Sequence, residues 1–244
     1  MKIDVTMPAT WRPELLERTL SSFYSNLFCF HRKDLRLIMN VDPIGAHGDK
    51  LHEIKLIARK FFDDIHIIAP ERPSFATAFN RLWSMAETDF VFYLEEDWVL
   101  TRPIDFGHMV DIMRRNSRLA HLRLNKFTAT EGYAETYHFQ FPWSGEFYEC
   151  LPIDKPSIAW CGHPSINSLR FVKEVISKIN PKANPEKQIK RCISAAPDNT
   201  YRYGIFSPRP CDTPCVQDIG RAWMKANNFT KKGGSMAFDT WEKL

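Results

Sequence analysis

The sequence predicts an α/β protein built on a parallel, doubly wound sheet. Short apolar runs alternate with helical patterns over the first hundred residues, the connections between them are short, and polar residues follow several of the runs. Alternation of this kind is typical of parallel sheets with helices on both faces. A chain of 244 residues with 44% apolar residues is also large enough to bury one sizeable core.

Four apolar runs in the first hundred residues have the length and the β-branched or aromatic content of buried strands. These runs are residues 2–8, 35–41, 65–69 and 90–94. Pro8 bounds the first of them. A fifth run, residues 120–125, predicts a further strand in the second half of the chain.

Helical periodicity fills the segments between these strands. One face of residues 13–28 carries Leu16, Leu20, Phe23 and Leu27. The same kind of spacing predicts helices over residues 50–62, 74–86, 104–116, 163–179, 184–196 and 217–227. Residues 126–160 are rich in aromatic and turn residues and lack a clear period, which predicts irregular strands and a mobile loop.

The composition is that of an ordinary soluble domain, with 25% charged residues and no apolar run long enough to cross a membrane. The chain enters a strand pattern close to Met1 and lacks the features of a signal peptide. Together these observations predict a cytoplasmic protein without a membrane span. Six scattered cysteines, of which Cys211 and Cys215 form the only close pair, favour free thiols over a zinc site.

The net charge of +4 is unevenly distributed. Residues 170–244 contain fourteen Lys and Arg against seven Asp and Glu, which leaves nineteen against twenty-two in residues 1–169. A basic C-terminal third on a mildly acidic body fits an anionic partner, although a solvated basic face explains the same pattern.

Acidic and polar residues follow three of the predicted strands. Glu95, Glu96 and Asp97 follow the strand that ends near Leu94, and Asp42 follows the second strand. Because parallel sheets bind ligands outside the carboxyl ends of their strands, these side chains are expected to meet at one edge. Thr10, Trp11 and Arg12 follow the first strand and join them there.

The spacing of the three acids indicates a metal site. In an extended segment Glu95 and Asp97 point to one side and Glu96 to the other. Two carboxylates on one side repel unless a cation joins them, and Mg²⁺ or Mn²⁺ is held by one or two carboxylates together with substrate phosphates. The alternative is an acidic turn that only caps the next element.

Several common nucleotide and hydrolase motifs are missing from the sequence. It contains no G-x-G-x-x-G, no G-x-x-x-x-G-K-[ST] and no G-x-S-x-G. These absences disfavour a dinucleotide-dependent dehydrogenase, a P-loop protein and a serine hydrolase. With ten glycines in the chain, a phosphate is expected to be held by metal and basic side chains.

Four segments in this order resemble the GT-A glycosyltransferases, and most of all their large inverting family with its many bacterial and phage enzymes. The segments are "VTMPATWRPELLERTLSSF", "NVD", "AFNRLWSMAETDFVFYLEEDW" and "WCGHPSINSLRFV". The resemblance covers about residues 1–190. It implies one GT-A domain with a mostly parallel sheet flanked by helices: a nucleotide-sugar half (1–100), an irregular acceptor half (101–190) and a basic C-terminal extension (191–244).

The resemblance also implies roles for individual residues. The metal motif would be Glu95-Glu96-Asp97, with Asp97 as the main ligand, Glu95 in place of the more usual aspartate, and Glu96 beside the cofactor. Arg81 would approach the diphosphate, and residues 160–165 would shape the donor-sugar and acceptor pocket.

Three further positions match those that hold the base and ribose of the nucleotide in this family. They are Thr10, Arg12 and Asp42. The match at Asp42 favours a UDP-sugar among the nucleotide-diphosphate sugars, while the sugar itself stays open.

An inverting transferase needs a carboxylate that takes the proton of the acceptor hydroxyl. Glu186 lies just after a proline at a predicted helix start, about where such enzymes carry this acid. Asp218 is the second candidate, followed by Asp198 and Asp212. His163 could be a third metal ligand or an acceptor contact, although a single histidine is more often structural.

The acceptor is left open between two classes. Small transferases of this style are typical of phages that modify their genomes, so duplex DNA with a 5-hydroxymethyl pyrimidine is slightly favoured, and the basic C-terminal third could bind its phosphates. The compartment would then be the cytoplasm of the host. A glycan or lipid-linked acceptor is the alternative. A nucleotidyltransferase and a non-catalytic sugar-binding or nucleic-acid-binding module are the candidates from other classes. The sequence does not predict an oligomeric state.

Overall fold

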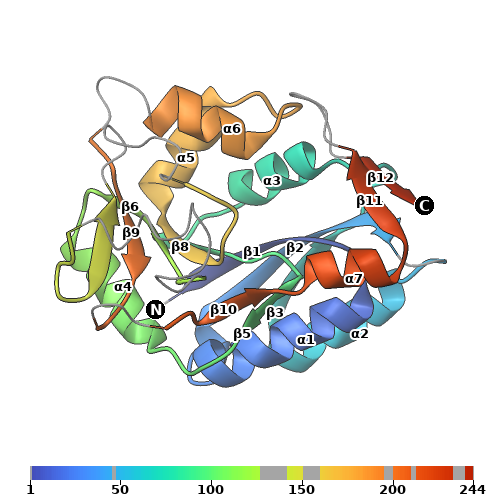
Figure 1. The fold of residues 1–244 in the computed structure, drawn as a ribbon, viewed down its shortest axis with the longest axis horizontal. Coiled ribbons are helices and arrows are strands. Elements are labelled where there is room, and N and C mark those ends of the chain that lie inside the picture. The colour runs from blue at the N-terminus through green and yellow to red at the C-terminus, as the bar shows by residue number, and fades with distance from the viewer. Residues whose placement is uncertain are drawn as a thin grey trace.

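The computed structural model describes residues 2–45, 48–126, 142–150, 160–194, 200–209, 213–232 and 240–243. Its centre is an eight-stranded sheet in the order β3-β2-β1-β4-β8-β6-β9-β7, covered by helices (Figure 1). The strands are β1 (Ile3–Trp11), β2 (Leu35–Gly45), β3 (Asp64–Ile68), β4 (Phe90–Tyr93), β6 (Leu119–Arg123), β7 (Phe147–Cys150), β8 (Ser165–Ser168) and β9 (Arg202–Phe206).

The first half of the sheet is parallel, as the sequence predicts. Strands β3, β2, β1 and β4 are hydrogen-bonded neighbours that all run in the same direction. Thr10 of β1 pairs with Asp42 of β2, and Thr6 of β1 pairs with Tyr93 at the end of β4. The carboxyl ends of these strands therefore lie at one edge, together with the acids that follow β4.

The second half of the sheet contains antiparallel strands. Strand β8 lies between β4 and β6 and is antiparallel to both. The prediction of a helix from residue 163 is wrong for residues 165–168, because this segment forms strand hydrogen bonds on both sides. The helix begins only at Leu169, where the hydroxyl of Ser168 accepts a hydrogen bond from the N–H of Phe171.

Two layers of helices cover the sheet. Their bounds are α1 (Pro13–Phe23), α2 (Leu51–Phe61), α3 (Phe75–Ser84), α4 (Phe106–Arg115), α5 (Leu169–Lys178), α6 (Pro185–Ile189) and α7 (Gly220–Ala226). Two predicted helices change their winding before they end, since Tyr24–Phe28 and Lys190–Ser194 are π-helical. The predicted helix over 217–227 is shorter than expected, because Val216–Asp218 forms strand β10.

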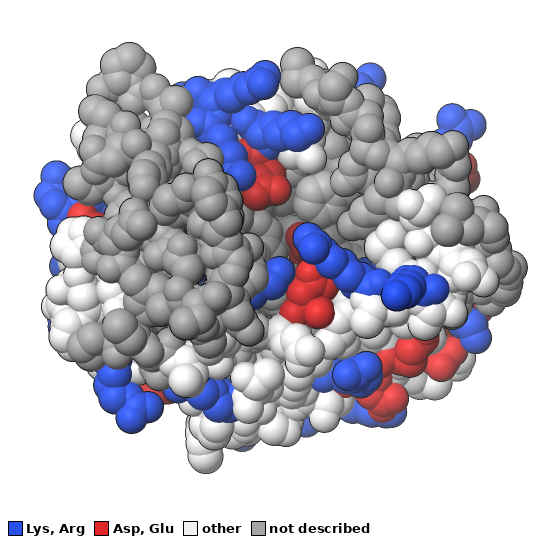
Figure 2. Space-filling model, viewed as in Figure 1, with Lys and Arg blue, Asp and Glu red and all other residues white. Residues whose placement is uncertain are grey.

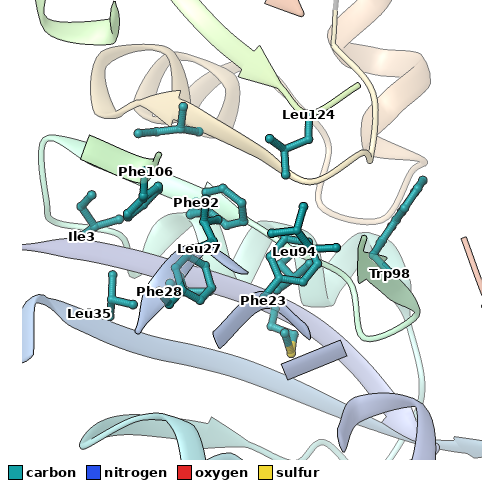
Figure 3. Close-up of a cluster of buried hydrophobic side chains, with 14 of the residues drawn as sticks. Ile3, Phe23, Leu27, Phe28, Leu35, Phe92, Leu94, Trp98, Phe106 and Leu124 are labelled. Carbon is teal, nitrogen blue, oxygen red and sulfur yellow. The ribbon is translucent and has the colours of Figure 1, made fainter. Parts of the chain in front are cut away.

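Aromatic side chains fill the core on both faces of the sheet. On the face covered by α1, α2 and α4, Phe28 makes edge-to-face contacts with Phe92 and Phe106 (Figure 3). On the face covered by α3, α5 and α6, Trp83 and Trp160 pack edge-to-face with ring centroids 5.5 Å apart. Edge-to-face aromatic pairs add stabilisation beyond the area they bury, so these contacts help to hold the helices against the sheet.

A short second sheet brings the C-terminal region to the acids. Strand β5 (Trp98–Leu100) follows them directly and pairs antiparallel with β10, with Asp218 opposite Trp98. A third sheet joins β11 (Phe229–Lys232) to β12 (Thr240–Lys243). Among the described residues, no helix has the length and apolar character that a membrane span requires.

Candidate active site

A cluster of one buried arginine, one buried acid and one partly exposed acid lies at the carboxyl edge of the parallel strands. The guanidinium of Arg12 makes a close ion pair with Glu96 Oε1, and its Nη2 lies 3.1 Å from Asp97 Oδ2. The hydroxyl of Thr10 donates to Glu96 Oε1 at 2.8 Å and accepts from Arg12 Nε at 2.8 Å. The side chains of Arg12 and Glu96 are only 3% and 4% exposed, so the pair is shielded from water.

The local backbone differs from the predicted extended conformation. Strand β4 ends at Tyr93, and Glu96 and Asp97 form a turn. The alternation that would place Glu95 with Asp97 and Glu96 opposite them therefore fails. Arg12 joins Glu96 to Asp97, and Glu95 instead accepts a hydrogen bond of 2.7 Å from the hydroxyl of Tyr93.

The cluster holds Arg12 in its charged form. Burial opposes the charge of Arg12, but the charges of Glu96 and Asp97 and their hydrogen bonds outweigh it and raise the pKa of the guanidinium. The ring of Trp223 lies 5.5 Å from the guanidinium carbon and adds a cation–π contact. Arg12 therefore supplies a fixed positive charge beside Asp97.

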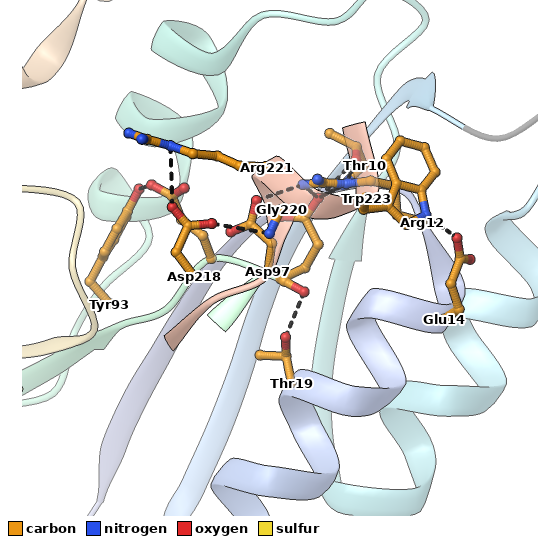
Figure 4. Close-up of polar contacts among 12 residues, drawn as sticks. Thr10, Arg12, Glu14, Thr19, Tyr93, Asp97, Asp218, Gly220, Arg221 and Trp223 are labelled. Carbon is orange, nitrogen blue, oxygen red and sulfur yellow. Dashed lines mark hydrogen bonds and ion pairs between the residues drawn. The ribbon is translucent and has the colours of Figure 1, made fainter. Parts of the chain in front are cut away.

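Helix α7 closes over Asp97 from the C-terminal region. The backbone N–H of Ile219 donates to the carbonyl of Asp97 at 2.9 Å. A methyl group added at Gly220 would lie 2.1 Å from Asp97 Oδ2, closer than any side chain tolerates. The first turn of α7 must therefore begin with glycine for the carboxylate to keep its place (Figure 4).

A second polar group lies at the end of β2. Asp42 is 7% exposed and accepts hydrogen bonds from Asn40 Nδ2 at 2.7 Å and from the N–H of Ser74 at 2.9 Å. Arg81 Nη1 donates to Asn40 Oδ1 at 2.6 Å, so Arg81 of α3 is linked to Asp42 through the amide. Burial raises the pKa of Asp42, opposed by the Asn40 and Ser74 hydrogen bonds.

Glu95 lies on the side of the acids that faces residues 160–165. A methyl group added at Gly162 would lie 2.9 Å from Glu95 Oε1, so this loop approaches the carboxylate closely. Burial and the neighbouring Glu95 raise the pKa of Tyr93 well above its ordinary value. Tyr93 therefore stays protonated and donates its hydrogen bond to Glu95.

Both candidates for the catalytic base lie within electrostatic reach of His163. Burial and the charges of Arg123 and Lys126 hold the pKa of His163 well below its ordinary value, while Glu186 and Asp218 act in the opposite direction. Glu186 is 40% exposed in the first turn of α6, and its Oε1 lies 3.3 Å from Lys190 Nζ.

Asp218 is held more tightly than Glu186. Its Oδ1 accepts from the N–H of Gly220 at 3.0 Å, and its Oδ2 lies 3.6 Å from Lys126 Nζ and 3.7 Å from Arg221 Nε. The two remaining acids, Asp198 and Asp212, lie outside the described residues.

The imidazole of His163 packs against Trp98, with ring centroids 5.1 Å apart. Two cationic side chains act on it, which disfavours a further cation at this ring. In the described part of the chain, no three His, Cys, Asp or Glu side chains lie close enough together to form a metal site by themselves.

Sequence reasoning did not single out several residues that shape this site. They are Tyr93, Arg123, Lys126 and Gly220. The glycine two residues after Asp218 in "QDIGRAW" is the local signal of close backbone approach. The others depend on contacts between distant segments.

Comparison with solved structures decides the fold. TarS from S. aureus superposes with a TM-score of 0.61 at 13% sequence identity, over 86% of this chain and 36% of that one. TarS 1–349 in complex with UDP gives a TM-score of 0.56 at 14% identity, over 85% of this chain and 61% of that one. The fold is GT-A.

A third GT-A structure binds a different donor. The mannosyltransferase PcManGT from Pyrobaculum calidifontis, in complex with GDP-Man and Mn²⁺, superposes with a TM-score of 0.53 at 10% identity, over 84% of this chain and 56% of that one. This chain thus spans less than two thirds of the length of these GT-A proteins. No protein-family model and no curated protein matches its sequence.

Proposed function

We propose that this chain is a metal-dependent, inverting glycosyltransferase that moves a sugar from a nucleotide-diphosphate sugar to a hydroxyl acceptor. The observation that carries the proposal is the meeting of Arg12, Glu96, Asp97 and Asp42 at the carboxyl edge of β1, β2 and β4. Ligands of open α/β sheets bind at this edge. The UDP and GDP-Man complexes of the GT-A neighbours support a nucleotide-sugar donor.

The acids fit a hard divalent ion that is shared with the donor. The side chain of Asp97 is 17% exposed at the sheet edge, so one of its oxygens can face a ligand. A site with one or two carboxylates suits Mg²⁺ or Mn²⁺, which completes its shell with phosphate oxygens and water. In this proposal Asp97 would be the main ligand with Glu95 assisting it, and a bound ion would supply charge neutralisation for a departing diphosphate. We assign His163 to contact with the acceptor and not to the metal ion.

The protein side chains position the donor and the metal ligand. Arg12 and Thr10 hold Glu96, and Arg12 fixes the orientation of Asp97 through its ion pair. Since the guanidinium of Arg12 is occupied by the two acids, we assign it to positioning them beside the nucleotide. Asp42 and Arg81, linked through Asn40, are assigned to the nucleotide, with a UDP-sugar favoured.

Glu186 is the proposed base that takes the proton of the acceptor hydroxyl. It is more exposed than Asp218, with 40% against 22% of the side chain accessible, and among the described residues it has one cationic partner where Asp218 has two. A more exposed carboxylate with fewer ion-pair partners is easier for an acceptor hydroxyl to reach. Asp218 is the alternative base.

A 5-hydroxymethyl pyrimidine in duplex DNA is the favoured acceptor. Exposed basic side chains occur on both helices that border the acids, Lys187 on α6 and Arg221 and Lys225 on α7. In Figure 2, Lys and Arg side chains flank the carboxylates near the middle of this face. Such an arrangement suits a polyanion whose phosphates need cationic partners.

The test is a mass-spectrometric transfer assay. The protein is incubated with a panel of nucleotide sugars and Mn²⁺ or Mg²⁺, and with duplex DNA that contains or lacks 5-hydroxymethylcytosine or 5-hydroxymethyluracil. A hexose or pentose mass gain on the modified base, abolished by EDTA, is expected. The DNA affinity should also fall steeply as salt increases.

Two variants make the assay decisive. Asp97→Asn should abolish transfer and donor hydrolysis, while Asp111→Asn, at an exposed position on α4, should leave both unchanged. Metal-dependent release of the nucleotide diphosphate without a gain on DNA would move the acceptor to a glycan or lipid-linked hydroxyl. No turnover of any donor would overturn the proposed function.

A further inference from the structure

A buried histidine, an asparagine and a cysteine form a connected polar group outside the acid cluster. His121 of β6 and Asn167 of β8 are directly opposite each other in the sheet and both are fully buried. His121 Nδ1 and Asn167 Oδ1 are 3.0 Å apart. Cys161 lies in the loop before β8, where Arg123 Nη1 donates to its Sγ at 2.9 Å.

The hydrogen bonds around Asn167 determine which nitrogen of His121 carries the proton. The indole N–H of Trp160, which can only donate, points at Asn167 Oδ1 at 3.2 Å. The amide nitrogen of Asn167 donates to the carbonyls of Val91 and Ser165, both at 3.3 Å. Because Oδ1 is therefore the acceptor, His121 must donate from Nδ1, and the neutral ring presents a lone pair at Nε2.

The remaining nitrogen of His121, Nε2, is available for an interaction with the thiol of Cys161. His121 Nε2 is buried and has no hydrogen bond of good geometry to the described residues. The imidazole and the thiol of Cys161 are close enough for each to change the pKa of the other. Burial lowers the pKa of His121, so the ring is neutral, and with Nδ1 taken by Asn167 its Nε2 is the nitrogen left to interact with the thiol.

Arg123 favours the charged form of the sulfur. Burial alone raises the pKa of the Cys161 thiol, but the charge of Arg123 and the hydrogen bond to His121 outweigh it and lower this pKa to about 6. At pH 7 about nine tenths of such a thiol is thiolate, compared with about 3% for a free cysteine of pKa about 8.5. Cys161 is also partly exposed, which a small reagent needs.

We propose that Cys161 is a nucleophilic thiolate, activated by His121 and Arg123, which reacts with peroxide to form a sulfenic acid. The sulfur attacks one oxygen of hydrogen peroxide, an S–O bond forms, and the O–O bond breaks. The sulfur is oxidised by two electrons and the peroxide is reduced. The departing hydroxide takes a proton from the solvent, so that one water is released.

The position of Cys161 connects this reaction to the acids. The next residue, Gly162, is the one whose missing side chain leaves room for Glu95. An added oxygen on Cys161 would change the packing and the Arg123 contact of this loop directly beside Glu95. Any effect on sugar transfer depends on the proposed function, so the thiol chemistry is tested on its own.

The test measures the reactivity of individual cysteines. Short pulses of iodoacetamide between pH 5 and 9, followed by peptide mass spectrometry, compare Cys161 with the exposed Cys192 in the same sample. Labelling of Cys161 should be half-maximal near pH 6. After treatment with hydrogen peroxide, a dimedone-type probe should label Cys161 several-fold more than Cys192.

Variants separate activation from simple accessibility. Arg123→Gln should move the midpoint for Cys161 toward that of a free cysteine by at least one pH unit. Arg114→Gln, which removes an exposed arginine of α4, should leave it in place. Cys161→Ser should remove the peroxide-dependent label. The proposal is overturned if Cys161 labels with the pH profile of Cys192, or if Arg123→Gln folds and leaves the profile unchanged.

Discussion

Gly220 lies so close to Asp97 that a methyl group at position 220 would be 2.1 Å from the Oδ2 of that carboxylate. The two residues are far apart in the sequence and meet because β10 pairs with β5 directly after the acids. The C-terminal region is therefore part of the candidate site, and the orientation of Asp97 depends on it.

Gly220→Ala should lower metal-dependent donor turnover by at least tenfold, because the new methyl group displaces the proposed metal ligand. Alanine is otherwise favourable in a helix, so the melting temperature should fall by only a few degrees. Steady-state donor hydrolysis at varied Mn²⁺ measures the effect. Gly107→Ala in α4 is the matched control and should keep full turnover. Full activity of Gly220→Ala would show that Asp97 is not held by this contact.

Arg12→Met should destabilise the fold by about 3–5 kcal/mol, because it leaves Glu96 and Asp97 without their buried cationic partner. Urea unfolding measures this change. The matched control is Arg32→Met, which breaks a pair whose side chains are 32% and 58% exposed. That loss should stay within about 1 kcal/mol.

A second substitution tests the origin of the Arg12 effect. Glu96→Gln in the Arg12→Met background should recover part of the lost stability, since it removes one of the uncompensated charges. A double variant less stable than Arg12→Met alone would contradict the ion-pair explanation.

Asp4 should make the protein sensitive to acid. Burial raises the pKa of this carboxyl, but hydrogen bonds from Arg36 and from the N–H groups of Glu87 and Thr88 outweigh burial and lower it. A lowered pKa means that the stabilising contribution is present above about pH 5 and is lost as the pH falls through about 4 and below.

Urea unfolding at a series of pH values checks this expectation. Asp4→Asn should be less stable at pH 7 and should show a smaller loss of stability between pH 5 and pH 3. Asp63→Asn, at a side chain 58% exposed, should follow the wild-type curve. An unchanged acid slope in Asp4→Asn would assign the sensitivity to other carboxyls.

Glu186→Gln should lower kcat for transfer by about 10²- to 10⁴-fold while the KM for the donor changes little, because only proton removal from the acceptor is lost. Asp218→Asn should have the smaller effect on kcat. Glu53→Gln, at an exposed position on α2, is the control. A larger kcat loss in Asp218→Asn would make Asp218 the base.

Local patterns predicted most of the architecture of the first hundred residues. The apolar runs at residues 35–41 and 90–94 are strands, and the face marked by Leu16, Leu20 and Phe23 is buried. These features are readable because the periodicity of a helix or strand is set by the residues within it. Placing Asp42 and the acids after β4 at one edge followed from the parallel order alone.

The second half of the chain was less predictable. Residues 165–168 combine small polar residues with one isoleucine directly before a helical pattern, and only pairing with β4 and β6 makes them a strand. Strand β9 lacked a signal of its own, since Arg202–Phe206 is short and lies next to turn residues. Strand pairing between distant segments outweighs weak local preference in such cases.

The sequence by itself determined the parallel α/β half of the fold, the edge where the acids gather and the glycosyltransferase hypothesis. The tertiary structure decided how the acids are used: Arg12 joins Glu96 to Asp97, and Gly220 closes over them. It also decided that His121 meets Asn167 across the sheet. The reason is that periodicity acts over a few residues, whereas these contacts join segments more than 40 residues apart and exist only once the strands have paired.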